Sequence, residues 1–109
     1  MRAGDLDRRI TIMRMGEEQQ DPGGGWIPAQ PELVATVWAA VQQTGGREFL
    51  DAAQVTAERR VVFRIRYRSD IQQDWWIEYG GWKHDVHEIR ELGRREGLEL
   101  HCTATEEAS

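Results

Sequence analysis

The sequence predicts a mainly β protein, a small antiparallel β-barrel of about six strands with one short helix in a long inter-strand loop. Apolar and polar residues alternate along several short segments, which is the period of a strand rather than a helix. Turn-forming residues separate these segments at intervals of roughly 8 to 12 residues, without the strand-helix alternation of a parallel α/β fold. At 109 residues the chain has the length of one domain, which excludes a two-domain enzyme.

The N-terminal part predicts a strand followed by a long loop. Two isoleucines share one face of residues 8–14, and β-branched residues at period two are typical of a strand. Residues 16–31 contain three consecutive glycines and three prolines, so we expect a long loop or a wide hairpin. Trp26 and Ile27 lie within it. We expect these two side chains to pin the loop to the body of the protein; contact with a partner is the alternative.

The next segments predict a buried strand and a short helix. Residues 33–43 are apolar on both faces, which indicates a strand that is buried on both sides or bent around a barrel. Residues 44–54 change to helical spacing after two consecutive glycines, with Phe49 and Leu50 on one side. We expect a two-turn helix there, which needs packing contacts to be stable.

Residues 55–68 carry the clearest strand pattern, with one apolar face and one basic face. The apolar side chains are those of Val61, Phe63, Ile65 and Tyr67. The basic side chains are those of Arg60, Arg64, Arg66 and Arg68.

The C-terminal part predicts a hairpin and a last strand. Residues 75–79 and 82–89 are strand-like and are joined by a Gly-Gly pair, which favours a tight two-residue turn. Residues 98–103 alternate again. We therefore expect a single domain over residues 1–103 and a flexible C-terminal tail over residues 104–109.

Charge and cysteine content narrow the function classes. The net charge is −5 and the isoelectric point about 5.2, which disfavours a nucleic-acid binder that relies on its overall field. No apolar run approaches about 18 residues and no secretion leader opens the chain, so we expect a soluble protein with no membrane partner. The single cysteine, Cys102, cannot form an internal disulfide, which favours a reducing compartment.

The sequence contains no constellation that predicts catalysis. The candidate metal ligands are His84, Asp85, His87, His101 and Cys102. On a strand His84 and His87 point to opposite faces, so we expect no metal site and no cofactor. No nucleophile motif surrounds Cys102, which we expect to be a buried small apolar residue. The paired carboxylates lie in polar loop or tail sequence, and we expect no enzymatic activity.

The basic face of residues 55–68, called here the arginine row, has two interpretations. It consists of Arg60, Arg64, Arg66 and Arg68. Guanidinium groups spaced about 7 Å apart along a strand face can track phosphates. The other interpretation is a solvated face, or one paired with acidic residues of a neighbouring strand or subunit, and the acidic chain favours it. An alternative function is an OB-like nucleic-acid-binding module in which exposed aromatic rings beside the arginines stack bases. The rings concerned are those of Trp75, Trp76 and Trp82.

Six stretches then occur in a family-like order and spacing: residues 1–12, 21–26, 34–41, 45–49, 64–68 and 98–102. Together they resemble the phage head-tail joining family, the small head-closure or stopper proteins of long-tailed phages and gene transfer agents. The resemblance extends from residue 1 to about residue 103.

That resemblance implies a structural virion connector without enzymatic activity. Such a protein forms a homo-oligomeric ring, of about six or twelve copies, that closes the head channel, retains DNA and provides the tail docking surface. The implied partners are an adaptor or portal ring on the head side, a tail terminator or tail tube protein on the tail side, and double-stranded DNA in the channel. The implied location is the head-tail neck of a virion or gene-transfer-agent particle, and the bacterial cytoplasm before assembly. A tail terminator ring protein is the alternative within this class.

The resemblance also points to a projecting loop at residues 42–54. Its candidate channel or ring-contact residues are Thr44, Gly45, Gly46, Arg47, Glu48, Phe49 and Leu50. The glycines supply a hinge and the two apolar residues an anchor; alternatively the helix caps one barrel end and buries Phe49. Because DNA must slide through a channel, we expect the arginine row at a subunit or ring interface first and facing DNA second.

Overall fold

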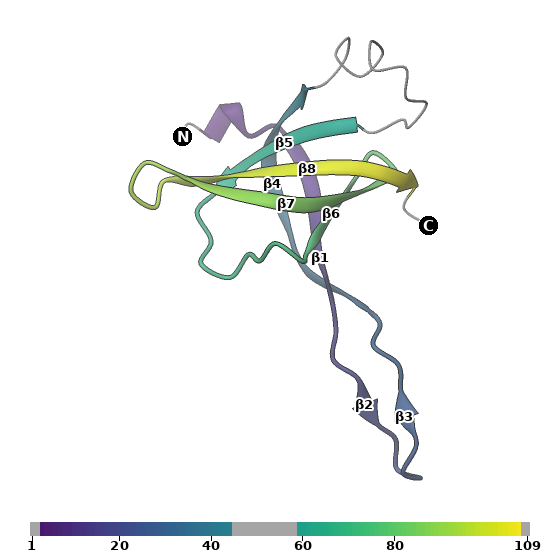
Figure 1. Ribbon diagram of the computed structural model, residues 1–109. Helices are drawn as coiled ribbons and strands as arrows, with labels where there is room; N and C mark the ends of the chain where they lie inside the picture. Colours follow the sequence, from purple (N-terminus) through teal and green to yellow (C-terminus); the bar gives the residue numbers. More distant parts are fainter. Residues whose placement is uncertain (1–2, 45–58, 108–109) are drawn as a thin grey trace.

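The structure is a computed structural model that describes residues 3–44 and 59–107. Within these residues six antiparallel strands close into a barrel in the order β1-β4-β5-β8-β7-β6 (Figure 1). The barrel strands are β1 (Arg8–Met15), β4 (Pro31–Thr44), β5 (Arg59–Arg66), β6 (Trp76–Tyr79), β7 (Trp82–Leu92) and β8 (Gly97–Glu107). A short 3-10 helix, η1 (Ala3–Asp5), precedes them. The predicted mainly β barrel is confirmed, while the helix predicted within residues 44–54 falls almost entirely outside the described residues.

The barrel interior is formed by the apolar face of each strand. On β5, Val61, Phe63 and Ile65 are buried, while Arg64 and Arg66 between and beyond them are exposed, as period two predicts. The Phe63 ring makes edge-to-face contacts with the Tyr79 ring at 5.8 Å and with the His84 ring at 5.1 Å between centroids. Such contacts add to the burial energy of the ring, so Phe63 anchors the core.

Strand β4 is bent around the barrel and is not buried on both sides. It pairs with β1 up to Ala39 and with β5 from Ala39 onward. Ala39 faces inward and is fully buried, whereas the neighbouring Trp38 is 51% exposed. A closed barrel has a single interior, so the second apolar face of β4 is turned to solvent.

The C-terminal strands form a long antiparallel pair that extends past the expected domain boundary. Gly80 and Gly81 form the turn between β6 and β7 with φ angles of 62° and 78°, values that disfavour residues with a Cβ. Strand β8 continues through Glu107, and Ala104 is fully buried opposite His84 of β7. Residues 104–107 therefore belong to the barrel, because β7 is long enough to pair with them, and the expected tail over these residues is wrong.

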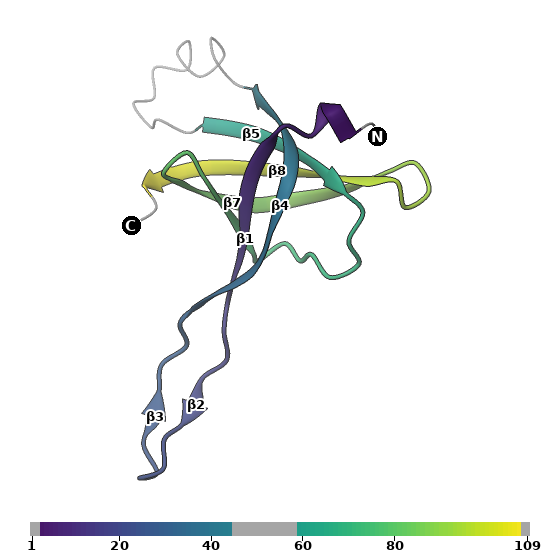
Figure 2. The ribbon, with the colours of Figure 1, turned by 180° about the vertical axis from the view of Figure 1, so that it is seen from behind.

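The connection between β1 and β4, residues 16–30, is an arm that projects from the barrel (Figures 1 and 2). Within it β2 (Gln19–Gln20) pairs with β3 (Trp26–Ile27) in a two-stranded antiparallel sheet. The wide-hairpin interpretation of this segment is therefore confirmed.

Candidate interaction surfaces

The tip of the arm is closed by Asp21. Its backbone N–H donates to the Gly25 carbonyl at 2.7 Å, and its carboxylate Oδ1 accepts the N–H groups of Gly23 and Gly25 at 2.8 Å each. Gly24 has a φ of 88°, which a glycine adopts without steric cost. An aspartate followed by glycines thus specifies a tight turn, and the turn holds Trp26 at a defined position on the returning strand.

The base of the arm is held by contacts between its two strands. The Gly16 N–H donates to the Gln30 carbonyl at 2.8 Å, and the Arg14 Nε lies 3.1 Å from the Glu32 carboxylate Oε2. The Glu32 carboxyl group lies over Gly16, where a Cβ would approach it to 2.9 Å. These contacts give the arm a fixed direction where it leaves the barrel.

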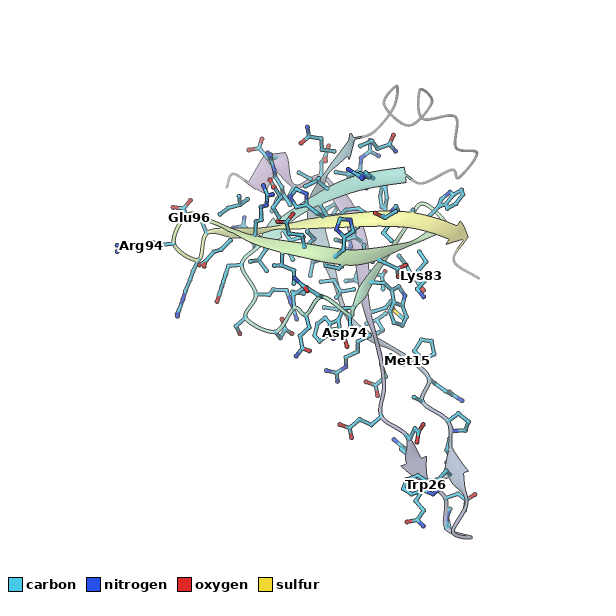
Figure 3. All side chains as sticks on the ribbon, in the orientation of Figure 1. Met15, Trp26, Asp74, Lys83, Arg94 and Glu96 are labelled. Carbon is cyan, nitrogen blue, oxygen red and sulfur yellow. The ribbon has the colours of Figure 1, made fainter. Side chains whose placement is uncertain are left out.

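Large apolar side chains are exposed along one part of the molecule. Among the described residues they are Met15, Trp26, Ile27, Leu33 and Trp38, all on β1, the arm or β4. Figure 3 shows Trp26 at the far end of the arm and Met15 at its base. Because Trp26 is 68% exposed, the expectation that it and Ile27 pin the loop to the body is wrong: the arm carries both away from the core. Contact with a partner stays a prediction.

Trp38 lies on the outer surface of the barrel with the cation of Arg9 over its ring. It pairs with Arg9 across β1 and β4, and the Arg9 guanidinium carbon lies 5.1 Å from the centroid of its ring, a cation-π distance. The sequence reasoning missed this surface, because apolar residues on both parities of β4 indicated burial. The one signal available was the position of an arginine opposite a tryptophan in the paired strands.

The arginine row is divided by the structure. Arg64 Nε lies 3.0 Å from the Glu99 carboxylate of β8, so one member pairs with an acidic residue of the neighbouring strand. Arg68, beyond the end of β5, is held by Asp70 in a bidentate pair at 2.9 and 3.1 Å. Arg60 and Arg66 are exposed. No ion pair of Arg66 with another described residue is present.

The partners in these ion pairs lower the pKa values of the two carboxyl groups. The Glu99 carboxylate contacts His101 Nε2 at 2.7 Å as well as Arg64, and these hydrogen bonds, the one to His101 first, lower the pKa of Glu99 against the opposing effect of burial. The hydrogen bond from Arg68 likewise lowers the pKa of Asp70. Both residues are tied into ion pairs, which assigns them a structural role.

The histidines and the cysteine occupy separate environments. His84 is buried beside Phe63, whereas His87 is exposed and contacts Thr103 Oγ1 at 3.0 Å, so the two rings lie on opposite faces as predicted. Within residues 3–44 and 59–107 no group of three His, Cys, Asp or Glu side chains is placed to hold a metal ion. Cys102 is 1% exposed, and this burial raises the pKa of its thiol well above the usual range. The prediction of a buried small apolar cysteine is confirmed.

Two of the three tryptophans of the OB-like alternative offer no open stacking surface, and the third, Trp82, is half-buried. Trp75 and Trp76 are both buried. Arg14 lies 5.7 Å from the Trp75 ring centroid and Lys83 lies 4.7 Å from that of Trp76, so one cation lies over each ring. Bases need an open aromatic face to stack on, and these two rings offer none.

The predicted loop lies at the end of β4. Gln42, Gln43 and the backbone of Thr44 belong to β4 itself, and the other residues predicted for channel or ring contact fall outside the described residues. Because β4 runs from the arm at Pro31 to Thr44, the connection to β5 leaves the end of β4 opposite the arm. Among residues 3–44 and 59–107, no helix is long and apolar enough to cross a bilayer.

The fold and these surfaces define a class: a small closed β-barrel with a projecting arm that carries exposed apolar side chains. The family model for phage head completion protein matches residues 1–106, and the chain belongs to this family. Its role is therefore that of a structural component of a phage head, which assembles with other virion proteins.

Two solved structures are similar to the whole chain. Protein SF1141 from Shigella flexneri 2a, solved in solution, has a TM-score of 0.69 at 25% identity and covers 95% of this chain and 96% of its own. A chain from the virion of a native gene transfer agent particle has a TM-score of 0.60 at 16% identity, over 94% of this chain and 97% of its own. The chain from the gene transfer agent particle therefore has the same fold as this chain. No curated protein matches the sequence.

Proposed function

We propose that copies of this chain form a closed ring, of about six or twelve members, at the neck between the head and the tail of a phage-like particle. The ring lies between the portal or adaptor ring and the tail terminator or tail tube. It closes the head channel, retains the packaged double-stranded DNA and offers the surface on which the tail docks. Before assembly the protein is in the bacterial cytoplasm.

The observation that carries this proposal is the match of the whole barrel to the phage head completion family. The exposed apolar side chains support it, since Trp26 and Trp38 are of the kind that form the centres of protein interfaces. A ring multiplies a modest contact, because each copy is held on two sides and the closed assembly is much more stable than any single interface. The same family membership favours the head side of the neck over the tail terminator alternative.

The segment assigned to channel contact is residues 42–54, by its resemblance to the projecting loop of the head-closure family. The arm and this segment start from opposite ends of β4, so ring contacts and channel contacts can be served by different ends of the barrel. The arginine row belongs first to a subunit or ring interface. The ion pairs of Arg64 and Arg68 support this order, because arginines neutralised by Glu99 and Asp70 do not grip DNA that has to slide.

A particle-assembly experiment tests the proposal. Particles are produced with the wild-type chain, without it, or with Phe49→Asp and Leu50→Asp together. Without the chain we expect heads that fill with DNA but lose it or carry no tail, and with the double variant we expect the same defect from a folded protein. A normal yield of tailed, DNA-filled particles without the chain contradicts the neck role. Normal particles with the double variant contradict only the loop assignment.

A further inference from the structure

The arm of this chain carries acidic residues, whereas the outer barrel surface around Trp38 carries arginines, and the arm points away from that surface. We propose that the arm of one copy docks on the outer barrel surface of the next copy, around Trp38. This surface, the Trp38 face, consists of Arg9, Trp38 and Arg66. The inference rests on the proposed ring and names the contact that closes it.

The Trp38 face is an exposed indole between two cations. Ala39 of β4 and Ile65 of β5 are paired and both point inward, so the adjoining Trp38 and Arg66 point outward from neighbouring strands. Arg9 lies on the other side of Trp38, over its ring. Arg66 is exposed and has no carboxylate partner among the described residues. Tryptophan and arginine together are typical of the residues that dominate interface energies.

The arm has the complementary character. Residues 16–30 contain three carboxylates, those of Glu17, Glu18 and Asp21, and no lysine or arginine. Since Gln20 pairs with Trp26, Glu18, two residues before Gln20, lies on the same face of the arm as Trp26. The arm thus presents carboxylates beside apolar side chains, and the Trp38 face presents cations beside an aromatic ring. A match of both charge and apolar area favours specific docking.

The geometry requires the arm and the Trp38 face that it contacts to belong to different molecules, and the proposed ring supplies a second copy of this chain as that molecule. The arm extends about 30 Å from Met15 to its tip, at roughly 3.3 Å per residue, and both views show it directed away from its own barrel (Figures 1 and 2). Its tip therefore cannot cover the Trp38 face of the same chain. A contact between two different patches on two copies is heterologous, and repetition of such a contact produces a ring when the rotation closes.

Cross-linking in assembled particles tests the contact directly. Particles are made with the full chain carrying Gln19→Cys and Thr36→Cys, two exposed positions beside Ile27 and Trp38 that leave both apolar side chains in place. They are treated with a short bismaleimide; the buried Cys102 does not react. We expect a ladder of covalent oligomers at multiples of the chain mass, because each copy is linked on both sides. A mixture of the two single variants is the control and gives dimers as its largest product. Monomers alone, or a product with another particle protein, overturn the inference.

Charge reversal tests the complementarity. The arm variant carries Glu17→Lys and Glu18→Lys, and the face variant carries Arg9→Glu and Arg66→Glu. We expect each to lower the yield of tailed particles by about tenfold or more, and their combination in one chain to restore it to within about threefold of wild type. Two control variants, Arg94→Glu and Glu96→Lys, each reverse a charge on the β7–β8 turn, far from the arm (Figure 3), and leave the yield unchanged. No recovery in the combined chain overturns the docking of arm on face.

The two proposals fail differently. If purified particles do not contain the chain at the neck, the proposed function fails. If they contain it as a ring but give no ladder and no charge-swap recovery, the ring stands and only this contact is wrong.

Discussion

Arg14 and Glu32 face each other across β1 and β4 at the base of the arm, with 3.1 Å between Nε and Oε2. Each of the two residues is one position from the end of its strand, where the arm leaves the barrel. Their ion pair therefore fixes the direction of the arm and adds little to the stability of the barrel. Exposed pairs of this kind contribute little to folding, and this pair is about half exposed on both sides.

Arg14→Ala is accordingly expected to change the free energy of unfolding by less than about 1 kcal/mol while it loosens the arm. The measurement is amide hydrogen exchange at Gly16, whose N–H donates to Gln30 beside the pair. Arg90→Ala is the control for loss of an exposed pair, because it removes the pair to Glu88 on β7. Glu32→Gln is a second arm variant, because it weakens the same pair and leaves the contact of Arg14 with the Trp75 ring in place. Faster exchange at Gly16 in the two arm variants alone is the expected result; equal rates in all three variants contradict a role in holding the arm.

Phe63→Ala is expected to destabilise the barrel by about 3–5 kcal/mol, because it deletes a fully buried ring and its contacts with Tyr79 and His84. Trp26→Ala, which deletes a larger but exposed side chain, is expected to change stability by about 0.5 kcal/mol or less. Urea unfolding of the two variants compares them. A large loss of stability in the Trp26 variant of the isolated protein contradicts its assignment to partner contact.

Stability at acid pH is expected to depend on Glu99. Hydrogen bonds with His101 and Arg64 lower its pKa in the folded state below the ordinary value of 4.5. The carboxylate therefore stabilises the fold above pH 4.5, and this contribution is lost as pH falls through the lowered folded-state pKa. Glu99→Gln should flatten the decline of thermal stability in that range, and Glu96→Gln should leave it unchanged. Part of the decline in stability remains in the Glu99→Gln variant, because the hydrogen bond from Arg68 also lowers the pKa of Asp70.

The Cys102 thiol is expected to be unreactive until the barrel opens. It is buried, and burial raises its pKa, so the thiolate that attacks disulfide reagents is scarce in the folded protein at pH 8. An aromatic disulfide reagent should modify it quickly in guanidinium chloride and at least about 100-fold more slowly in native buffer. Fast modification of the native protein contradicts the placement of Cys102 in the core.

The sequence predicts those parts of the barrel that are determined by local residue pattern, namely strand faces and tight turns. Alternation around Phe63 places one strand face in the core, and Gly80-Gly81 fits a turn that needs positive φ, so both were predictable. Trp26 and Trp38 were not, because apolar character predicts burial without saying whether the covering surface belongs to the same chain. The sequence does not predict that Ala104 is in the barrel, because the length of β8 is set by its partner β7 rather than by its own residues.

Electron cryomicroscopy of assembled particles, with the density of this chain located and its copies counted, tests the central claim most directly. The account predicts a closed ring of these barrels around the DNA channel between head and tail, with each arm lying on the neighbouring barrel. Particles in which the chain is absent from the neck, or present there as isolated copies that do not encircle the channel, contradict it.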